Sequence, residues 1–191
     1  ASKAIRGDFG VSIRQGIPVR TLIGERLGAT LELAFMSVLI AVFLGIPFGV
    51  FAATRRGTVW DYGSMLISLV GVSMPGFWLG LILLSYVALK VEALPMFGRE
   101  GSIFGGLWVL FTQFRADELI TGIRYIILPA LSIGTSMMAI IARLTRSSLL
   151  EVLGKDYIRT AQAKGLSKRV VVIKHGLRNA LLPVITIVGI Q

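Results

Sequence analysis

The sequence predicts an all-α protein, built as a polytopic bundle of transmembrane helices. Of its 191 residues, 54% are hydrophobic and 16% are charged, whereas a soluble domain carries about 25% charged residues. Long apolar stretches recur along the chain, and several reach the length of about 20 residues that a membrane-spanning helix requires. A chain this apolar could not cover its own surface in water, so its composition excludes both a disordered chain and a single soluble core.

The charged residues point to a membrane protein with a basic cytoplasmic face. The net charge is +10, from 20 Lys and Arg against 10 Asp and Glu. A basic excess occurs in nucleic-acid-binding proteins, but in an apolar chain it is more typical of loops that are kept in the cytoplasm. We therefore expect no nucleic-acid partner. The chain has no cysteine and one histidine, His175, which argues against a metal site, and no catalytic residue is predicted.

The first predicted span covers residues 30–53. Residues 1–29 are polar and rich in turn-forming residues, so they are expected to form an extracytoplasmic segment leading into this span, with a helical pattern from Val19. Glu32 is the only charge in the span and is expected to reach water at the outer interface. Arg55, Arg56 and Gly57 end the span, and residues 54–63 are predicted to be a cytoplasmic loop.

The second predicted span covers residues 64–89 and carries no charge. Ser73, Pro75 and Gly76 lie in its middle. A proline inside a helix lacks one backbone donor and clashes with the preceding turn, so we expect a kink or break there. These three residues are the candidates for a kink or for a position beside a transport pathway.

The rest of the chain alternates in the same way. Residues 90–124 are predicted to be an extracytoplasmic loop, with an interfacial aromatic patch around residues 107–114. Residues 125–142 form the third predicted span and residues 143–180 a cytoplasmic loop. Residues 181–191 are expected to be the start of a truncated transmembrane helix, so the chain is expected to be a fragment of a longer protein.

The orientation follows from the distribution of charge. Residues 143–178 carry nine Lys and Arg against two acidic residues, whereas residues 90–124 carry four of each. The positive-inside rule places the first segment in the cytoplasm and the second outside. Residues 1–29 then lie outside although they hold five basic residues, which predicts a further membrane helix upstream of this sequence.

The cytoplasmic loop contains two short predicted helices. Asp156 is expected to cap a helix over residues 157–164, and Gly165 can adopt the positive φ that ends it. Ser167 is expected to cap the next helix. Such a loop could present a rigid basic surface to a partner, or it could be an ordinary solvated amphipathic loop; the residues alone leave both readings open.

The stretch from Asp156 to Leu166 resembles the EAA loop of ABC importer permeases. Gly165 matches the glycine of that motif and Ala161 its second alanine, whereas Arg159 and Thr160 stand where Glu and the first alanine would be. These departures are similar to those of the peptide and nickel permease branch, in particular its B-type subunits. Segments 7–10 and 73–78 also look like that branch, and the resemblance covers nearly the whole chain.

This resemblance implies a permease fold of the MetI-like type, of which the chain would be an incomplete piece of a six-helix subunit. It implies a multi-pass protein of the bacterial inner membrane, surrounded by lipid, that forms half of a pathway with a second homologous permease. Two cytoplasmic ATPase subunits and an extracytoplasmic solute-binding protein would be its other partners. The sequence has no Walker A pattern, so ATP and Mg would be bound by the ATPases, and this chain would bind no cofactor and catalyse no reaction.

Carried over by position, the residues that would dock on the ATPase are Asp156, Tyr157, Arg159, Thr160, Ala161, Ala163, Lys164, Gly165, Leu166 and Lys168. The expected solute is a dipeptide or oligopeptide, or a related solute such as a nickel chelate or glutathione. A secondary transporter is the first alternative, disfavoured because no Asp, Glu or Lys lies in the middle of a predicted span. The second alternative is a membrane scaffold that recruits a cytoplasmic partner through the basic loop.

Overall fold

The computed structural model describes residues 9–91 and 94–190, and in these ranges the chain is helical apart from connecting segments and an isolated bridge between Val11 and Pro18. Three helical segments are long and apolar enough to cross a membrane, namely Val19–Thr54, Asp117–Leu153 and Lys168–Ile190. The bent pair Val59–Ser73 and Gly76–Ala88 makes a fourth if it is counted as one span. The predicted all-α, polytopic fold class is confirmed.

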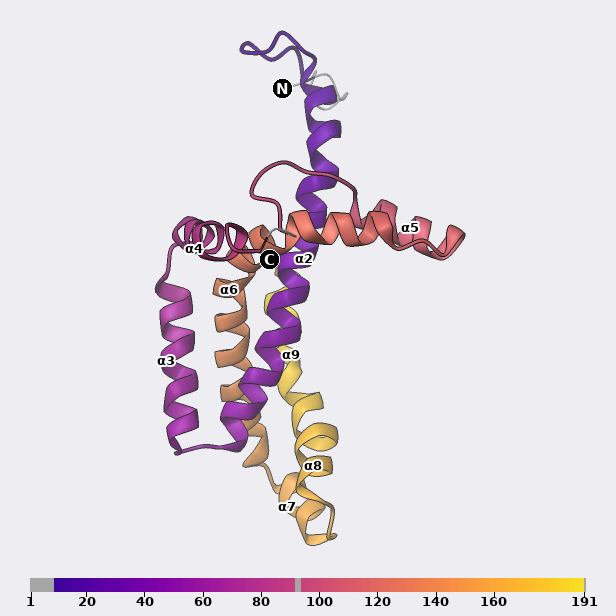
Figure 1. Ribbon diagram of the computed structural model, residues 1–191. Coiled ribbons are helices and arrows are strands. Elements are labelled where there is room, and N and C mark those ends of the chain that lie inside the picture. Colours follow the sequence, from indigo (N-terminus) through magenta and orange to yellow (C-terminus); the bar gives the residue numbers. More distant parts are fainter. Residues whose placement is uncertain (1–8, 92–93, 191) are drawn as a thin grey trace.

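Two long helices, α2 (Val19–Thr54) and α6 (Asp117–Leu153), form the centre of the molecule (Figure 1). Both extend well beyond the spans expected over residues 30–53 and 125–142. The expected bounds marked only the apolar part of each helix, because hydropathy reports transfer into lipid and not helix formation. Helix α2 starts at Val19, where the sequence already showed a helical pattern.

Helices α2 and α6 approach each other closely at glycines. A Cβ atom on Gly49 would lie 2.5 Å from the carbonyl oxygen of Ala142, and one on Gly45 would lie 2.9 Å from that of Met138. On α6, a Cβ atom on Gly134 would lie 2.8 Å from the carbonyl oxygen of Ser37. Gly45 and Gly49 form a G-x-x-x-G pair, which lets two membrane helices meet backbone to backbone. The sequence analysis did not use this pattern.

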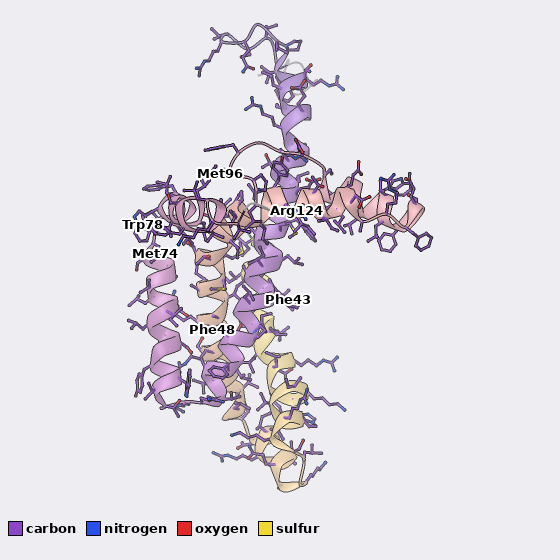
Figure 2. All side chains as sticks on the ribbon, in the orientation of Figure 1. Phe43, Phe48, Met74, Trp78, Met96 and Arg124 are labelled. Atoms are coloured by element: carbon purple, nitrogen blue, oxygen red, sulfur yellow. The ribbon has the colours of Figure 1, made fainter. Side chains whose placement is uncertain are left out.

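The second apolar stretch is broken in two. Helices α3 (Val59–Ser73) and α4 (Gly76–Leu83) are separated by two residues in extended conformation, Met74 and Pro75, and the segments on either side of them meet at 101°. Proline disfavours the helical conformation for the residue before it, which explains why Met74 leaves the helix. The break predicted at Pro75 is confirmed, and Figure 2 shows Met74 and Trp78 at this corner.

Helix α4 continues into the π-helical turn η1 (Leu84–Ala88), and helix α5 (Ile103–Gln113) lies between this turn and α6 in the sequence. The Ser102 side chain caps α5 by accepting a hydrogen bond from the Gly105 amide at 3.0 Å. Helix α5 projects sideways from the long helices (Figure 1), and Trp108, Phe111 and Phe114 are exposed on it. Its position at a lipid interface stays a prediction.

The opposite end of the molecule carries α7 (Asp156–Ala163) and α8 (Lys168–Val170). The π-helix η2 (Val171–Leu177) and α9 (Arg178–Ile190) run back from it along the long helices (Figure 1). Residues 143–153, expected in a loop, are the last turns of α6. The helical run that holds residues 181–190 begins at Lys168. Ala53, Leu149, Val172 and Ala180 form the core that joins these elements to α2 and α6.

Candidate functional site

The segment 156–168 consists of the short helix α7 and the turn that leads into α8, and α7 has its own small core. Ile158 is fully buried and Ala161 is 7% exposed, and both pack with Val171 of η2 and with Leu153 at the end of α6. The Asn179 amide nitrogen donates a hydrogen bond to the Tyr157 hydroxyl at 2.8 Å. Helix α7 is therefore braced against η2 and α9, and it cannot turn freely about its connection to α6.

The residues that start and end α7 differ partly from expectation. Helix α7 begins at Asp156, and Lys155 occupies the N-cap position without a side-chain hydrogen bond. The Asp156 carboxylate lies 3.6 Å from Arg159 instead, so the expected Asp156 cap is wrong, although an acidic residue in the first turn still favours the helix dipole. Ser167 precedes α8 but makes no side-chain cap bond, so that expectation is also wrong.

Gly165 separates α7 from α8 as expected. Its φ is +76°, and its amide donates to the Gln162 carbonyl at 2.9 Å. A Cβ atom at Gly165 would meet nothing within 4 Å. Backbone conformation alone therefore demands glycine here, since residues with a side chain rarely adopt this φ.

The sequence-predicted docking residues fall into two groups. Ala161 faces the core of the segment and is closed to a partner, so it is a packing residue. The others are exposed and form one continuous stretch of chain at the end of the molecule. They are Asp156, Tyr157, Arg159, Thr160, Ala163, Lys164, Gly165, Leu166 and Lys168.

The second predicted group, Ser73, Pro75 and Gly76, lies elsewhere. It forms the corner between α3 and α4, at the end of α3 that lies away from α7 (Figure 1). The Ser132 hydroxyl of α6 donates to the Gly76 carbonyl at 2.6 Å. This bond fixes the corner to α6.

Glu32 is buried, not exposed to water as its position near a span end suggested. Its side chain is 4% exposed and accepts hydrogen bonds from the Arg99 guanidinium at 2.8 Å, from the Ser102 hydroxyl, and from the Phe104 amide at 3.4 Å. Residues 99–104 lie against α2 and cover this carboxylate. A buried charge persists where it is paired and hydrogen-bonded in this way.

A second buried ion pair was not found by the sequence analysis. Arg146 Nε donates to Asp61 Oδ1 at 2.6 Å, Arg146 Nη2 donates to Oδ2 at 2.8 Å, and the Gly57 amide donates to Oδ2 at 3.0 Å. One signal in the sequence points to Asp61: it is an acidic residue four positions after Gly57, in a short loop between two apolar stretches. Its partner, 85 residues further along the chain, could not be identified without the fold.

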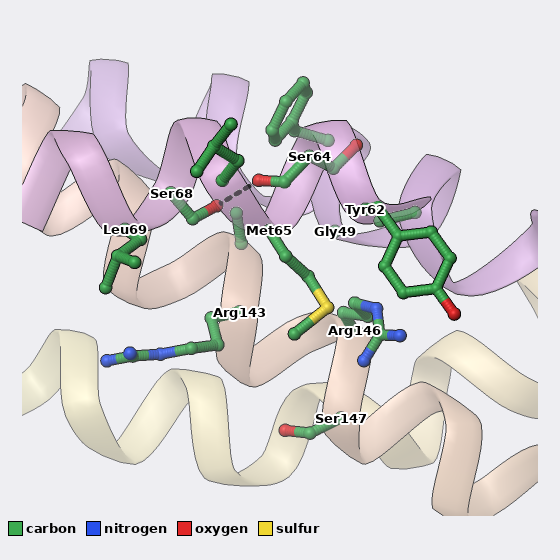
Figure 3. Close-up of a pocket in the computed structure, with 13 residues that line it drawn as sticks. Gly49, Tyr62, Ser64, Met65, Ser68, Leu69, Arg143, Arg146 and Ser147 are labelled. Carbon is green, nitrogen blue, oxygen red and sulfur yellow. Dashed lines mark hydrogen bonds between the residues drawn. The ribbon is translucent and has the colours of Figure 1, made fainter. Parts of the chain in front are cut away.

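A cavity of about 330 Å³ lies beside this pair, between α2, α3 and α6. Its lining is apolar over Met65, Leu66 and Leu69 and basic at Arg143 and Arg146. Figure 3 shows Arg143 and Arg146 extending in different directions from α6, with the Met65 side chain reaching between them.

The apolar helices long enough to span a bilayer define a polytopic membrane protein. The chain belongs to the family of binding-protein-dependent transport system inner membrane components, whose family model matches residues 45–191. The match includes α3, α6 and the whole of α7.

Several characterised relatives match nearly the whole chain. The dipeptide transport system permease protein DppB of Escherichia coli K12 is 41% identical over 98% of this chain and 58% of its own length. DppB of Alkalihalophilus pseudofirmus is 45% identical over 97% of this chain, and the oligopeptide transport system permease protein AppB of Bacillus subtilis is 45% identical over 98%. The chain spans 56–58% of the length of these relatives.

Proposed function

We propose that this chain is part of a permease subunit of an ATP-driven importer of small peptides, and that segment 156–168 docks on a cytoplasmic ATPase. Family membership and relatives named for dipeptide and oligopeptide transport support the solute class. The observation that carries the docking proposal is the core of Ile158, Ala161 and Val171. It holds α7 as a fixed projection, and the exposed basic residues Lys164 and Lys168 follow it.

In this proposal ATP and Mg are bound and ATP is hydrolysed by two partner ATPases, while the chain itself moves. Helix α7 follows α6 after only Gly154 and Lys155, and it packs on η2, which continues into α9. A displacement of α7 therefore passes to two spanning helices at once. A second permease subunit completes the pathway, and an extracytoplasmic binding protein delivers the peptide. The corner at Ser73, Pro75 and Gly76 adjoins the pathway.

The main polar contact to the ATPase is assigned to Arg159, because the glutamate of the EAA motif is absent here. The Arg159 side chain is 76% exposed, and its only ion pair among the described residues is the loose contact with Asp156. Its guanidinium is therefore free to bind a carboxylate of the partner.

The test is the substitution Arg159→Glu in the full-length permease, assembled with its partner subunits in reconstituted membranes. We expect less ATPase to co-purify and a partial loss of the ATP hydrolysis that the substrate-loaded binding protein stimulates. The matched control is Arg115→Glu, an exposed arginine outside segment 156–168, which should change neither quantity.

Three outcomes contradict the proposal. If the binding protein stimulates ATP hydrolysis fully in Arg159→Glu, then Arg159 is not the main polar contact to the ATPase. Peptide uptake by the unmodified permease without ATP indicates a secondary transporter. Binding of a cytoplasmic partner with no uptake of any solute indicates a scaffold. Competition by a nickel chelate or glutathione, but not by a dipeptide, would change the solute class alone.

A further inference from the structure

The Asp61–Arg146 ion pair joins three parts of the chain at the end that carries α7. Asp61 lies in the first turn of α3, the Gly57 amide that it binds belongs to the turn between α2 and α3, and Arg146 lies near the end of α6. The Asp61 side chain is 3% exposed and that of Arg146 is 19% exposed. The two parallel hydrogen bonds fix the relative orientation of the two side chains. Separating them would leave a buried charge without a partner, which is energetically costly.

The remaining contacts between α3 and this part of α6 are weaker. The buried residues of α3 besides Asp61 are Ser64, Ser68 and Gly71. The Ser64 and Ser68 hydroxyls donate to carbonyls of their own helix, at 2.6 and 2.9 Å. The cavity of about 330 Å³ occupies the space where side chains would otherwise interlock. Between this half of α3 and α6, the ion pair, and not close packing, is therefore the main contact.

The position of Arg146 relates the pair to α7. Helix α6 ends at Leu153, seven residues after Arg146 and three before the start of α7. On the proposed function, a movement imposed on α7 by the ATPase reaches Arg146 after two helical turns. We propose that Asp61 and Arg146 are positioning residues that make α3 move together with α6 during transport.

The first experiment compares Asp61→Asn with the unmodified permease in the reconstituted importer. The measured quantity is the number of peptide molecules taken up per ATP hydrolysed. We expect it to fall by about fivefold or more, the usual lower size of a coupling effect, because hydrolysis continues while α3 no longer follows α6. The charge exchange Asp61→Arg with Arg146→Asp should restore part of this ratio.

The matched control is Glu151→Gln. It removes an acidic residue of α6 at the same end of the molecule, but the Glu151–Lys155 pair is exposed and joins residues four apart. The ratio should not change. An unchanged ratio in Asp61→Asn overturns the inference while ATP-dependent uptake by the unmodified permease still supports the proposed function. Uptake without ATP overturns both.

A second experiment does not depend on whether Asp61→Asn folds. The chain has no cysteine, so Gly71→Cys with Ala139→Cys introduces a single pair, at a site where an added Cβ on Gly71 lies 3.2 Å from the Ala139 Cβ. Oxidation would link α3 covalently to α6. If the two helices move together, the oxidised permease retains its uptake. Arrest of uptake on oxidation, reversed by a reductant, means that the helices must slide past each other and overturns the inference.

Discussion

At the scale of single residues, the molecule depends on two buried carboxylates and a few glycines whose roles differ. Glu32 and Asp61 each receive several hydrogen bonds, including one or two from an arginine. Gly165 is needed for its φ, whereas Gly49 is needed for close approach of two helices. Substitutions at these positions are therefore expected to fail for different physical reasons.

Replacing Glu32 should release the segment that precedes α5. Glu32→Ala leaves Arg99 and Ser102 without their acceptor, at a cost of about 1–3 kcal/mol. Hydrogen exchange of the amides in residues 102–106 should become faster. The control is Glu25→Ala on the same helix, where the side chain is exposed, and exchange should stay unchanged. If these amides exchange at the same rate in Glu32→Ala as in the unmodified protein, the Glu32 carboxylate does not hold this segment.

Replacing Gly165 should misdirect α7 without unfolding the spans. In Gly165→Val the β-branched side chain is strained at φ +76° by about 1–3 kcal/mol, and the segment relaxes by changing the direction of the chain. Uptake and stimulated ATP hydrolysis should both fall sharply in reconstituted membranes. The control is Gly16→Val, which imposes a similar strain at φ +65°, also in open space. Because Gly16 lies outside segment 156–168, uptake and stimulated ATP hydrolysis should be retained. Full coupling in Gly165→Val would exclude residues 156–165 as the docking segment.

At the scale of helices, the sequence predicted the interruptions better than the lengths. The break at Pro75 and the end of α7 at Gly165 were predictable, because proline and glycine act through local backbone geometry. The full lengths of α2 and α6 were not, because their polar ends are helical without being apolar. The burial of Glu32 and the pairing of Asp61 with Arg146 depend on contacts between distant segments, which a single sequence does not reveal.

The α2–α6 crossing can be tested with a pair of glycines on one helix. Gly49→Ala places a methyl group 2.5 Å from a backbone oxygen, so the helices must separate, at a cost of about 1–3 kcal/mol. Gly28→Ala adds the same methyl group in open space and should stabilise α2 by up to about 1 kcal/mol. Thermal unfolding in detergent measures both. A midpoint for Gly49→Ala as high as that of Gly28→Ala would contradict the close crossing.

The corner between α3 and α4 should matter for transport more than for assembly. Pro75→Ala lets Met74 become helical, which pulls the Gly76 carbonyl away from the Ser132 hydroxyl. We expect uptake to fall while co-purification of the partner subunits is retained. Ser132→Ala removes the same hydrogen bond without changing the backbone preference and should have a smaller effect. Normal uptake in Pro75→Ala would show that the corner does not adjoin the pathway.

At the scale of the whole molecule, helix α7 and the turn between α2 and α3 lie toward one end, and α4 and α5 toward the other (Figure 1). The positive-inside rule predicts that the end with α7 is cytoplasmic. Gln162→Cys and Gln113→Cys place single thiols on exposed positions of α7 and α5. In oriented membranes an impermeant reagent added outside should label only Gln113→Cys. Labelling of Gln162→Cys from outside would reverse the topology.

The Asp61–Arg146 pair is buried, whereas the basic residues of segment 156–168 are exposed, so the two contacts differ in their sensitivity to ionic strength. Mobile ions screen exposed charges over about 10 Å at 0.1 M salt, but they act much less on charges enclosed by protein. Added salt should therefore detach the ATPase before it loosens α3 from α6. At high ionic strength the permease would therefore take up no peptide, because the ATPase has dissociated from it. The Asp61–Arg146 pair would stay intact, so uptake should return when the salt is diluted.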